Sequence, residues 1–197
     1  MKTNRMTSSG VAAAGAALMV LGLAGCSSDS GATATPTSTE AAALDTCPTA
    51  APESSADPEW TLEGQTGSVE VTGSTASSAP VIDVETAFSI DETQVSTLQA
   101  GDGPVVGDDA EVSVCYVGVN GRDGSVFDSS YERGAPAEFP LGGVVPGFQK
   151  AIAGQTVGST VAVAMSSADG YPDGQPRAGI AAGDSLVFAI SILAVTG

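Results

Sequence analysis

The most informative stretch of this chain for its fold is SVFDSSYERGAPAEFPLGGVVPGF, residues 125–148. It places a carboxylate, Asp128, directly after Phe127. Further apolar side chains follow in the same stretch: Phe139, Val144, Val145 and Phe148. A carboxylate among rings needs a partner or a shifted pKa, because removing a charge from water is costly. Aromatic residues make up only 5% of the chain, so three phenylalanine rings gathered here indicate a lined site rather than plain core.

Charge and composition exclude several classes of function. The 197 residues include six Lys and Arg against 23 Asp and Glu, a formal net charge of −17. Such a chain repels phosphate backbones, so we expect no nucleic-acid partner. It has no His, which excludes Ser-His-Asp and Cys-His catalytic groups and every His-ligated metal site. Three scattered cysteines are too few for zinc, and we therefore expect neither a metal nor another cofactor.

On either side of residues 125–148, the apolar pattern has the period of β-strands. Alternation predicts short strands over residues 69–71, 81–90, 93–99, 112–118, 160–165 and 185–195. Asn120–Gly124 predicts a hairpin turn. Phe148, Ala151 and Ile152, spaced i, i+3 and i+4, predict one short helix that Gly154 ends. We therefore expect an α+β fold in which an antiparallel β-sheet wraps around one short α-helix.

The N-terminal residues have the features of an export signal followed by a lipid-attachment site. Lys2 and Arg5 precede the apolar run VAAAGAALMVLGLAG, which has the length of a signal peptide. The run ends Leu23-Ala24-Gly25-Cys26, and this tetrapeptide looks like a bacterial lipobox. We predict a lipoprotein signal peptide over residues 1–25 and lipidation of Cys26, several acyl chains giving stable anchoring. The alternative is an ordinary secreted protein in which Cys26 is incidental.

The next segment, residues 26–65, is rich in Ser, Thr, Ala and Pro and has no apolar period. Such a composition cannot bury enough surface to offset its ordering entropy, so we predict a flexible tether. Trp60 interrupts the pattern, and the sequence leaves open whether it docks on the domain. The domain itself is predicted over residues 66–197. It begins with the predicted strands over 69–71, 81–90 and 93–99, called the lead-in strands. The Gly- and Pro-rich loop 166–179 carries Tyr171, and loops of this length are often functional.

Four segments then occur in one order: VSVCYVG (112–118), VFDSSYERG (126–134), PLGGVVPGF (140–148) and DSLVFAISIL (184–193). Together they resemble an FKBP-type peptidyl-prolyl cis-trans isomerase over about residues 101–195. The resemblance implies the FKBP-like form of the predicted fold, prolyl isomerase activity and proline-containing polypeptide clients. It leaves open whether macrolide inhibitors bind.

The resemblance also assigns roles to individual residues. It implies catalytic roles for Asp128, Tyr116, Phe127 and Tyr171 and substrate-binding roles for Phe139, Val144, Val145, Phe148, Ile180 and Phe188. Phe148 would form the pocket floor, and Tyr116 would hold the Asp128 carboxylate. Tyr171, with the Val145 N–H, would donate to substrate carbonyls. Arg133 is expected either to pair with Asp128 or to lie solvated at the surface.

Prolyl isomerisation needs no nucleophile, metal or cofactor, because no bond breaks. Its barrier is about 20 kcal/mol, and twisting the amide lessens charge separation, so an apolar, water-poor pocket favours the transition state. Four departures from the family pattern bear on substrate preference and rate. The segment between Leu141 and Val144 is short, and the Gly- and Pro-rich loop around Tyr171 has no His. Phe148 stands where the floor ring is commonly Trp, and Ala137 stands where a wall aromatic is common.

We therefore expect an isomerase that assists the folding of exported proteins, lipid-anchored to the outer face of a bacterial cell membrane. One alternative is an FKBP-like binding module or chaperone with little turnover, which Ala137 favours. Another is a structural envelope lipoprotein without a pocket function, which the clustered aromatics argue against.

Cys47 and Cys115 form a possible disulfide. With Cys26 acylated, these two thiols remain in an oxidising compartment. Tyr116 is expected to point into the pocket, so Cys115 should point away from it. The tether could fold back over that outer face and bring Cys47 close. Two free thiols are the alternative.

Overall fold

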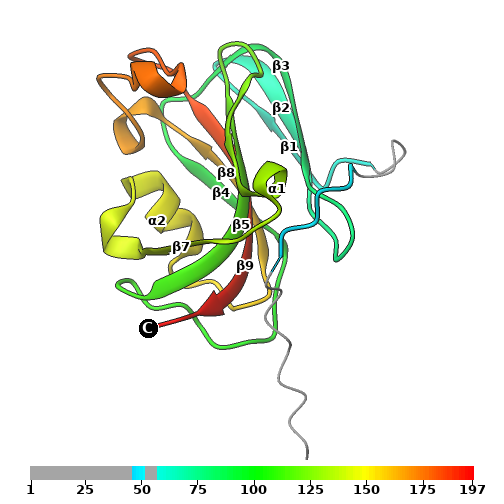
Figure 1. The fold of residues 1–197 in the computed structure, drawn as a ribbon. Coiled ribbons are helices and arrows are strands. Elements are labelled where there is room, and N and C mark those ends of the chain that lie inside the picture. The colour runs from blue at the N-terminus through cyan, green and yellow to red at the C-terminus, as the bar shows by residue number, and fades with distance from the viewer. Residues whose placement is uncertain (1–45, 52–56) are drawn as a thin grey trace, which may run out of the picture. The chain divides into compact units, whose positions relative to one another are not determined.

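The computed structural model describes residues 46–51 and 57–197 (Figure 1). Its first sheet has the order β1-β2-β3, formed by β1 (Trp60–Glu63), β2 (Thr66–Thr72) and β3 (Val81–Ser89). The second has the order β4-β8-β9-β5-β6, formed by β4 (Gln94–Gln99), β5 (Glu111–Asn120), β6 (Val126–Ser129), β8 (Thr160–Met165) and β9 (Leu186–Val195). A further strand, β7 (Ala137–Pro140), pairs with β5. All these pairings are antiparallel.

The main helix, α2 (Pro146–Ile152), packs against one face of the second sheet (Figure 1). Proline at its first position suits a helix start, where the missing N–H costs nothing. Its buried side chains, Phe148, Ala151 and Ile152, join one core with the inward residues of the strands. The predicted fold class, an antiparallel sheet wrapped around one short helix, is confirmed, and so is the predicted helix.

The other face of the second sheet is covered by the first sheet. Along β8, Val161, Val163 and Met165 point into the core beneath α2. The alternate residues, Ala162 and Ala164, pack with Val69, Val71 and Phe88 of the first sheet. This explains why every residue of β8 is buried. Of the predicted lead-in strands, those over 69–71 and 81–90 therefore belong to the first sheet, a second layer of the same domain, whereas that over 93–99 is β4 of the second sheet.

The predicted flexible tether over residues 26–65 is wrong in two places. Within 46–51, Cys47 is buried and disulfide-bonded to Cys115, and the Ala50 carbonyl accepts from the Ala79 N–H, so this segment is held on the domain. The second place is the C-terminal end of the predicted tether. Trp60–Glu63 form β1, which pairs with β2 along its whole length. Trp60 is half-buried and packs on the core between the sheets, so it docks on the domain. The composition of 26–65 concealed this strand because four residues are too short to show a period.

The predicted signal peptide over 1–25 and the lipidation site Cys26 lie outside the described residues. Within the part of the chain that the structure describes, no helix is long and apolar enough to cross a membrane.

Candidate active site

Five aromatic rings meet where α2 faces the second sheet. Phe148 of α2 lies at the centre, with ring centroids 5.7 Å from Tyr116, 5.5 Å from Phe139 and 5.1 Å from Phe188. Phe127 contacts Phe188 edge to face at 5.5 Å. Phe148 and Phe188 are each only 5% exposed, whereas Tyr116, Phe127 and Phe139 are half-buried. The buried pair thus lies at the centre of the ring cluster, and the half-buried rings lie around it.

A short helix that was not predicted from the sequence lies beside these rings. Helix α1 (Ser130–Arg133) follows directly after Asp128 and Ser129. Ser129 caps its N-terminus by accepting from the Glu132 N–H, and Gly134 ends it in the left-handed conformation with φ 67°. The Ser-x-x-Glu spacing and the following Gly are local signals that could have predicted it. Its last residue, Arg133, is brought back toward Asp128.

Asp128, Arg133 and Tyr116 form a hydrogen-bonded group. Arg133 Nη1 donates to Asp128 Oδ1 at 2.5 Å, and the Tyr116 hydroxyl donates to Oδ2. The Arg133 guanidinium also lies over the Tyr116 ring, 5.8 Å from its centroid. Arg133 was expected either to pair with Asp128 or to lie solvated at the surface, and in the structure it pairs with Asp128. The Asp128 side chain is 43% exposed. The carboxylate is therefore less enclosed by apolar groups than the sequence led us to expect.

The electrostatics of this group keep Asp128 charged. Partial burial raises the pKa of Asp128, but hydrogen bonds from Tyr116 and Arg133 outweigh it and hold the pKa below its ordinary value. Burial, followed by the hydrogen bond to Asp128, raises the pKa of Tyr116. Both residues therefore keep their neutral-pH forms, an ionised carboxylate and a phenol that donates to it.

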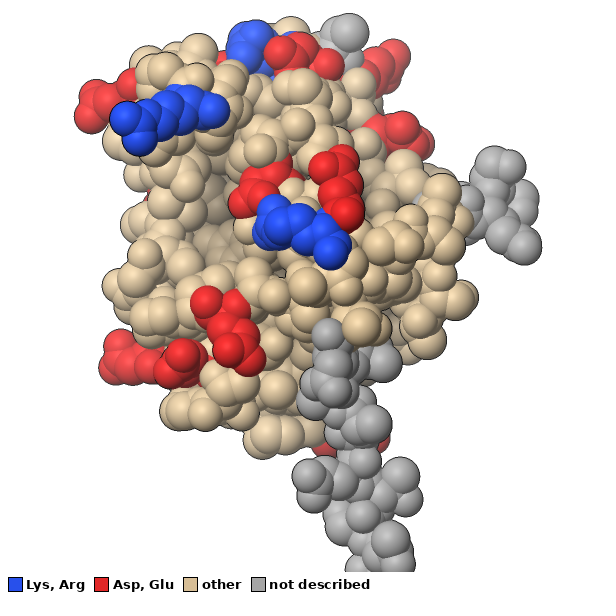
Figure 2. Space-filling model, in the orientation of Figure 1, with Lys and Arg blue, Asp and Glu red and all other residues tan. Residues whose placement is uncertain are grey.

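A cavity of about 440 Å³ opens beside Phe127 and Asp128. Its other lining residues come from the loop between β8 and β9: Tyr171, Gln175, Arg177, Ala178 and Ile180. Figure 2 shows this face hollowed between α2 and the 166–180 loop, with both basic and acidic side chains around the hollow. The cavity is thus walled by β6 on one side and by this loop on the other.

Two hydrogen-bond donors near the cavity are available to a ligand. The Tyr171 hydroxyl and the Val145 N–H have no hydrogen-bond partner among the described residues. Val144 and Val145 are half-buried against the core that contains the rings, directly before α2. The two unpaired donors therefore belong to the residue before α2 and to the loop between β8 and β9.

The predicted site residues divide into two sets. Four line the cavity: Phe127, Asp128, Tyr171 and Ile180. Six belong to the core or pack against it: Tyr116, Phe139, Val144, Val145, Phe148 and Phe188. Three further residues that were not predicted from the sequence also line the cavity: Gln175, Arg177 and Ala178. Their place in the Gly- and Pro-rich loop after Tyr171 was the available signal.

The loop wall is held in place from the β5–β6 turn. Asp184, whose side chain is only 7% exposed, accepts from Asn120 Nδ2 at 2.7 Å and from Arg122 Nε at 3.2 Å. It also accepts from the Ala181 N–H at 2.8 Å. Arg122 donates further to the Gly179 carbonyl at 3.0 Å. Because β6 follows this turn, the network ties together the two walls of the cavity.

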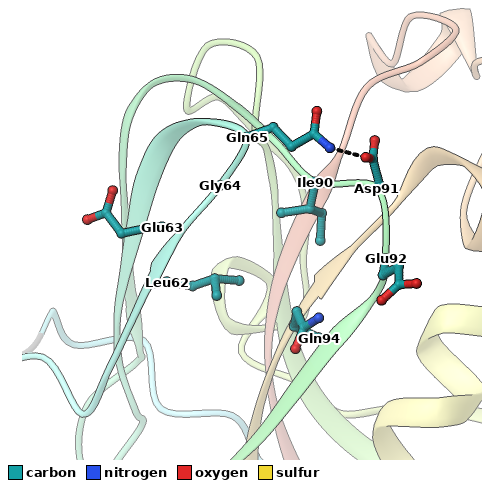
Figure 3. A pocket seen from close by; sticks show the side chains of 8 residues that line it. All are labelled: Leu62, Glu63, Gly64, Gln65, Ile90, Asp91, Glu92 and Gln94. Atoms are coloured by element: carbon teal, nitrogen blue, oxygen red, sulfur yellow. Dashed lines mark hydrogen bonds between the residues drawn. The ribbon is translucent and has the colours of Figure 1, made fainter.

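A larger cavity of about 570 Å³ lies elsewhere, between the β1–β2 turn and the β3–β4 connection (Figure 3). Leu62 and Ile90 face it, and Gln65 donates to Asp91 across its edge. Its lining includes no aromatic ring and no basic side chain, and three carboxylates stand around it: Glu63, Asp91 and Glu92. It therefore lacks the aromatic rings that line the cavity beside Asp128.

The structure thus has a cavity with two aromatic residues, Phe127 and Tyr171, in its lining, on an antiparallel sheet wrapped around one helix. A family model described as "FKBP-type peptidyl-prolyl cis-trans isomerase" matches residues 103–193. The chain is 32% identical over 115 residues to a protein of Corynebacterium glutamicum named "Probable FK506-binding protein", covering 58% of this chain and 96% of that protein. It is 36% identical over 104 residues to an FK506-binding protein of Streptomyces anulatus, covering 51% of this chain and 84% of that protein.

A third relative, named "Outer membrane protein MIP", comes from Legionella longbeachae. It is 32% identical over 102 residues, which cover 52% of this chain and 43% of that protein. The chain belongs to the FKBP-type peptidyl-prolyl cis-trans isomerase family. The enzyme class predicted from the sequence is confirmed.

Proposed function

We propose that this prolyl isomerase works outside the cytoplasmic membrane on exported, proline-containing polypeptides, held there by a lipid on Cys26. The lipobox-like Leu23–Cys26 after an apolar run supports the anchor. The disulfide between Cys47 and Cys115 supports the compartment, because disulfides persist in oxidising environments. The Legionella relative named as an outer membrane protein is compatible with this location.

We further propose the following roles at the site. The substrate proline ring sits on Phe148, with Phe127, Phe139 and Phe188 excluding water and Val144, Val145 and Ile180 completing the apolar lining. Asp128, held by Tyr116 and Arg133, faces the carbonyl carbon of the twisting amide. Tyr171 Oη and the Val145 N–H donate to substrate carbonyls. The ring cluster centred on Phe148 carries this proposal, because an apolar site favours the less charge-separated, twisted amide.

A protease-coupled assay on a proline tetrapeptide tests the activity. The soluble form should begin at Ser27, because a form that began at residue 66 would lack Cys47 and β1. We expect the wild-type protein to accelerate isomerisation and Phe127→Ala to lose most of that acceleration in protein whose circular dichroism is unchanged. Two relatives are named for FK506, so a macrolide of that class should compete with the peptide. Wild-type rates in Phe127→Ala would remove this cavity as the active site.

The second candidate is a peptide-binding module or chaperone with little turnover. Ala137 favours it, since the residue is half-buried on the same face of β7 as Phe139, where a second ring would close the site. Peptide binding measured by fluorescence, without any acceleration of isomerisation, would establish this candidate in place of the enzyme.

The anchor has a separate test. Labelled palmitate should enter the wild-type protein in bacterial cells, and Cys26→Ser should move the protein from the membrane fraction to the soluble one. Unchanged membrane association of Cys26→Ser would place the anchor elsewhere.

A further inference from the structure

Four basic residues follow the predicted signal peptide, and three of them form ion pairs. Arg122 pairs with Asp184 at 3.2 Å, Arg133 with Asp128 at 2.5 Å and Lys150 with Asp169 at 2.7 Å. The fourth, Arg177, forms no ion pair with any described residue, although acidic residues greatly outnumber basic ones in this chain. Arg177 is exposed and lines the cavity beside Asp128.

The backbone that carries Arg177 is held in a tight turn. Arg177 lies in the 3-10 helix η3 (Pro176–Ala178), which Gly179 ends with φ 73°. Gln175 and Ile180 exchange two backbone hydrogen bonds, of 2.8 and 3.1 Å, across the base of this turn. Arg122 also donates to the Gly179 carbonyl. The guanidinium therefore extends from a fixed base at the wall of the cavity.

Arg177 carries the unpaired charge of the cavity lining. Among its lining residues only Asp128 and Arg177 carry a charge, and Arg133 already neutralises Asp128. Removal of Lys2 and Arg5 with the signal peptide would leave four basic and 23 acidic residues, a formal net charge of −19. Outside this cavity the surface therefore repels an acidic client, whereas the cavity wall offers it one unpaired cation.

We propose that Arg177 makes this site selective for polypeptides that carry an acidic side chain next to the apolar residue–proline pair. The proposal rests on the function proposed above, in which that pair occupies the aromatic site. The guanidinium forms an ion pair with the client carboxylate at the cavity wall. The contact is exposed to solvent, so its effect is a few-fold preference that salt weakens.

The test uses the full-length protein in detergent with three peptides, which carry Glu, Gln or Lys beside a Leu-Pro pair. Both kcat/KM and the dissociation constant are measured for each peptide, with the variable residue placed before the pair and then after it. We expect the Glu peptide to exceed the Lys peptide by about three- to fivefold in one of the two placements. The preference should disappear at 0.5 M salt and in Arg177→Gln, and it should remain in Arg177→Lys.

Lys150→Gln is the matched control, because it removes the same charge at a residue outside the cavity lining. The Glu-to-Lys ratio should stay at its wild-type value in this variant. Equal values for the Glu and Lys peptides in the wild-type protein would overturn the proposal. An equal loss of the preference in Lys150→Gln and Arg177→Gln would also overturn it, since net charge would then explain the selectivity.

Failure of this proposal is distinguishable from failure of the proposed function. If all three peptides are isomerised at equal rates, the selectivity proposed for Arg177 is refuted and the proposed isomerase function stands. If no peptide is isomerised, the enzyme proposal fails, and the ratio of dissociation constants decides whether Arg177 selects acidic peptides. If no peptide binds, both proposals fail.

Discussion

Cys47 is joined to Cys115 by a disulfide bond, with their Cα atoms 5.7 Å apart, and Cys115 directly precedes Tyr116. Tyr116 donates from its hydroxyl to Asp128 and from its backbone N–H to Ser130 Oγ at 2.8 Å. Ser130 Oγ in turn lies 3.4 Å from Cys47 Sγ. The segment before the domain is thus tied to the outer side of the strand whose inner side carries the candidate catalytic tyrosine.

Replacing both cysteines by serine should destabilise the domain. The cysteines are 68 residues apart, and closing a loop of that length contributes about 4 kcal/mol in the chain-entropy model. Urea denaturation of Cys47→Ser/Cys115→Ser should show a loss of that order. Dithiothreitol should shift the wild-type midpoint in the same direction and leave the double variant unchanged. A wild-type curve that reductant does not alter would contradict the tie.

Asp128 should stay ionised over the whole physiological range. Its folded pKa lies below the ordinary value of 3.8, so the stability that its ionised form contributes is fully present above that pH and is lost as pH falls through the lower folded value. The chain has no His, so kcat/KM should be flat between about pH 5 and 8. An inflection near pH 6 that Asp128→Asn removes would show a raised pKa instead.

Asp128→Asn should also slow the reaction. The substitution keeps the side-chain volume and removes the charge that Tyr116 and Arg133 orient. We expect about a tenfold lower kcat, or roughly 1.4 kcal/mol in barrier, with a smaller change in KM.

Tyr171→Phe should lose one hydrogen bond to the substrate. The Tyr171 hydroxyl is free among the described residues and lines the cavity. The expected cost is on the order of 1 kcal/mol, or about fivefold in kcat/KM. Tyr131→Phe is the matched control, because Tyr131 is buried outside the cavity and its hydroxyl bonds to Ser191 at 2.9 Å. It should lower the free energy of unfolding and leave kcat/KM near the wild-type value.

Ala137→Phe should add a wall to the site. Ala137 and Phe139 share one face of β7, and Phe139 packs on Phe148. A ring at residue 137 would bury more of the residue before proline, and each additional 40 Å² of apolar area contributes about 1 kcal/mol. Peptide binding should therefore tighten about fivefold for Leu-Pro and little for Gly-Pro. Equal gains for both peptides would indicate a different contact.

Asp184→Ala should loosen the loop wall of the cavity. The substitution leaves Arg122, Asn120 and the Ala181 N–H without their shared acceptor. Loss of hydrogen bonds to a buried charge should cost about 3 kcal/mol of stability, measured by urea denaturation, and should raise KM more than it lowers kcat. The exposed Asp173, in the same loop, serves as control, and Asp173→Ala should change neither quantity appreciably.

The residues alone determined the elements whose patterns are local. Alternation along 160–165 and 185–195 predicted β8 and β9, and the i, i+3, i+4 spacing after Phe148 predicted α2. Each depends on the side-chain period of one segment, which tertiary packing here reinforces. The Ser129, Glu132 and Gly134 signals for α1 were equally local, so that helix was predictable and was missed.

Which residues far apart in the sequence come into contact depends on the tertiary structure. Cys47 reaches Cys115, Trp60 starts a paired strand, and Arg133 reaches Asp128, whereas Arg177 is left without an ion-pair partner among the described residues. Neither residue type nor period specifies these outcomes. They depend on how the strands pair across long separations in the chain, because that pairing determines the distance between any two side chains, and the energy of a charge pair or a disulfide depends on that distance.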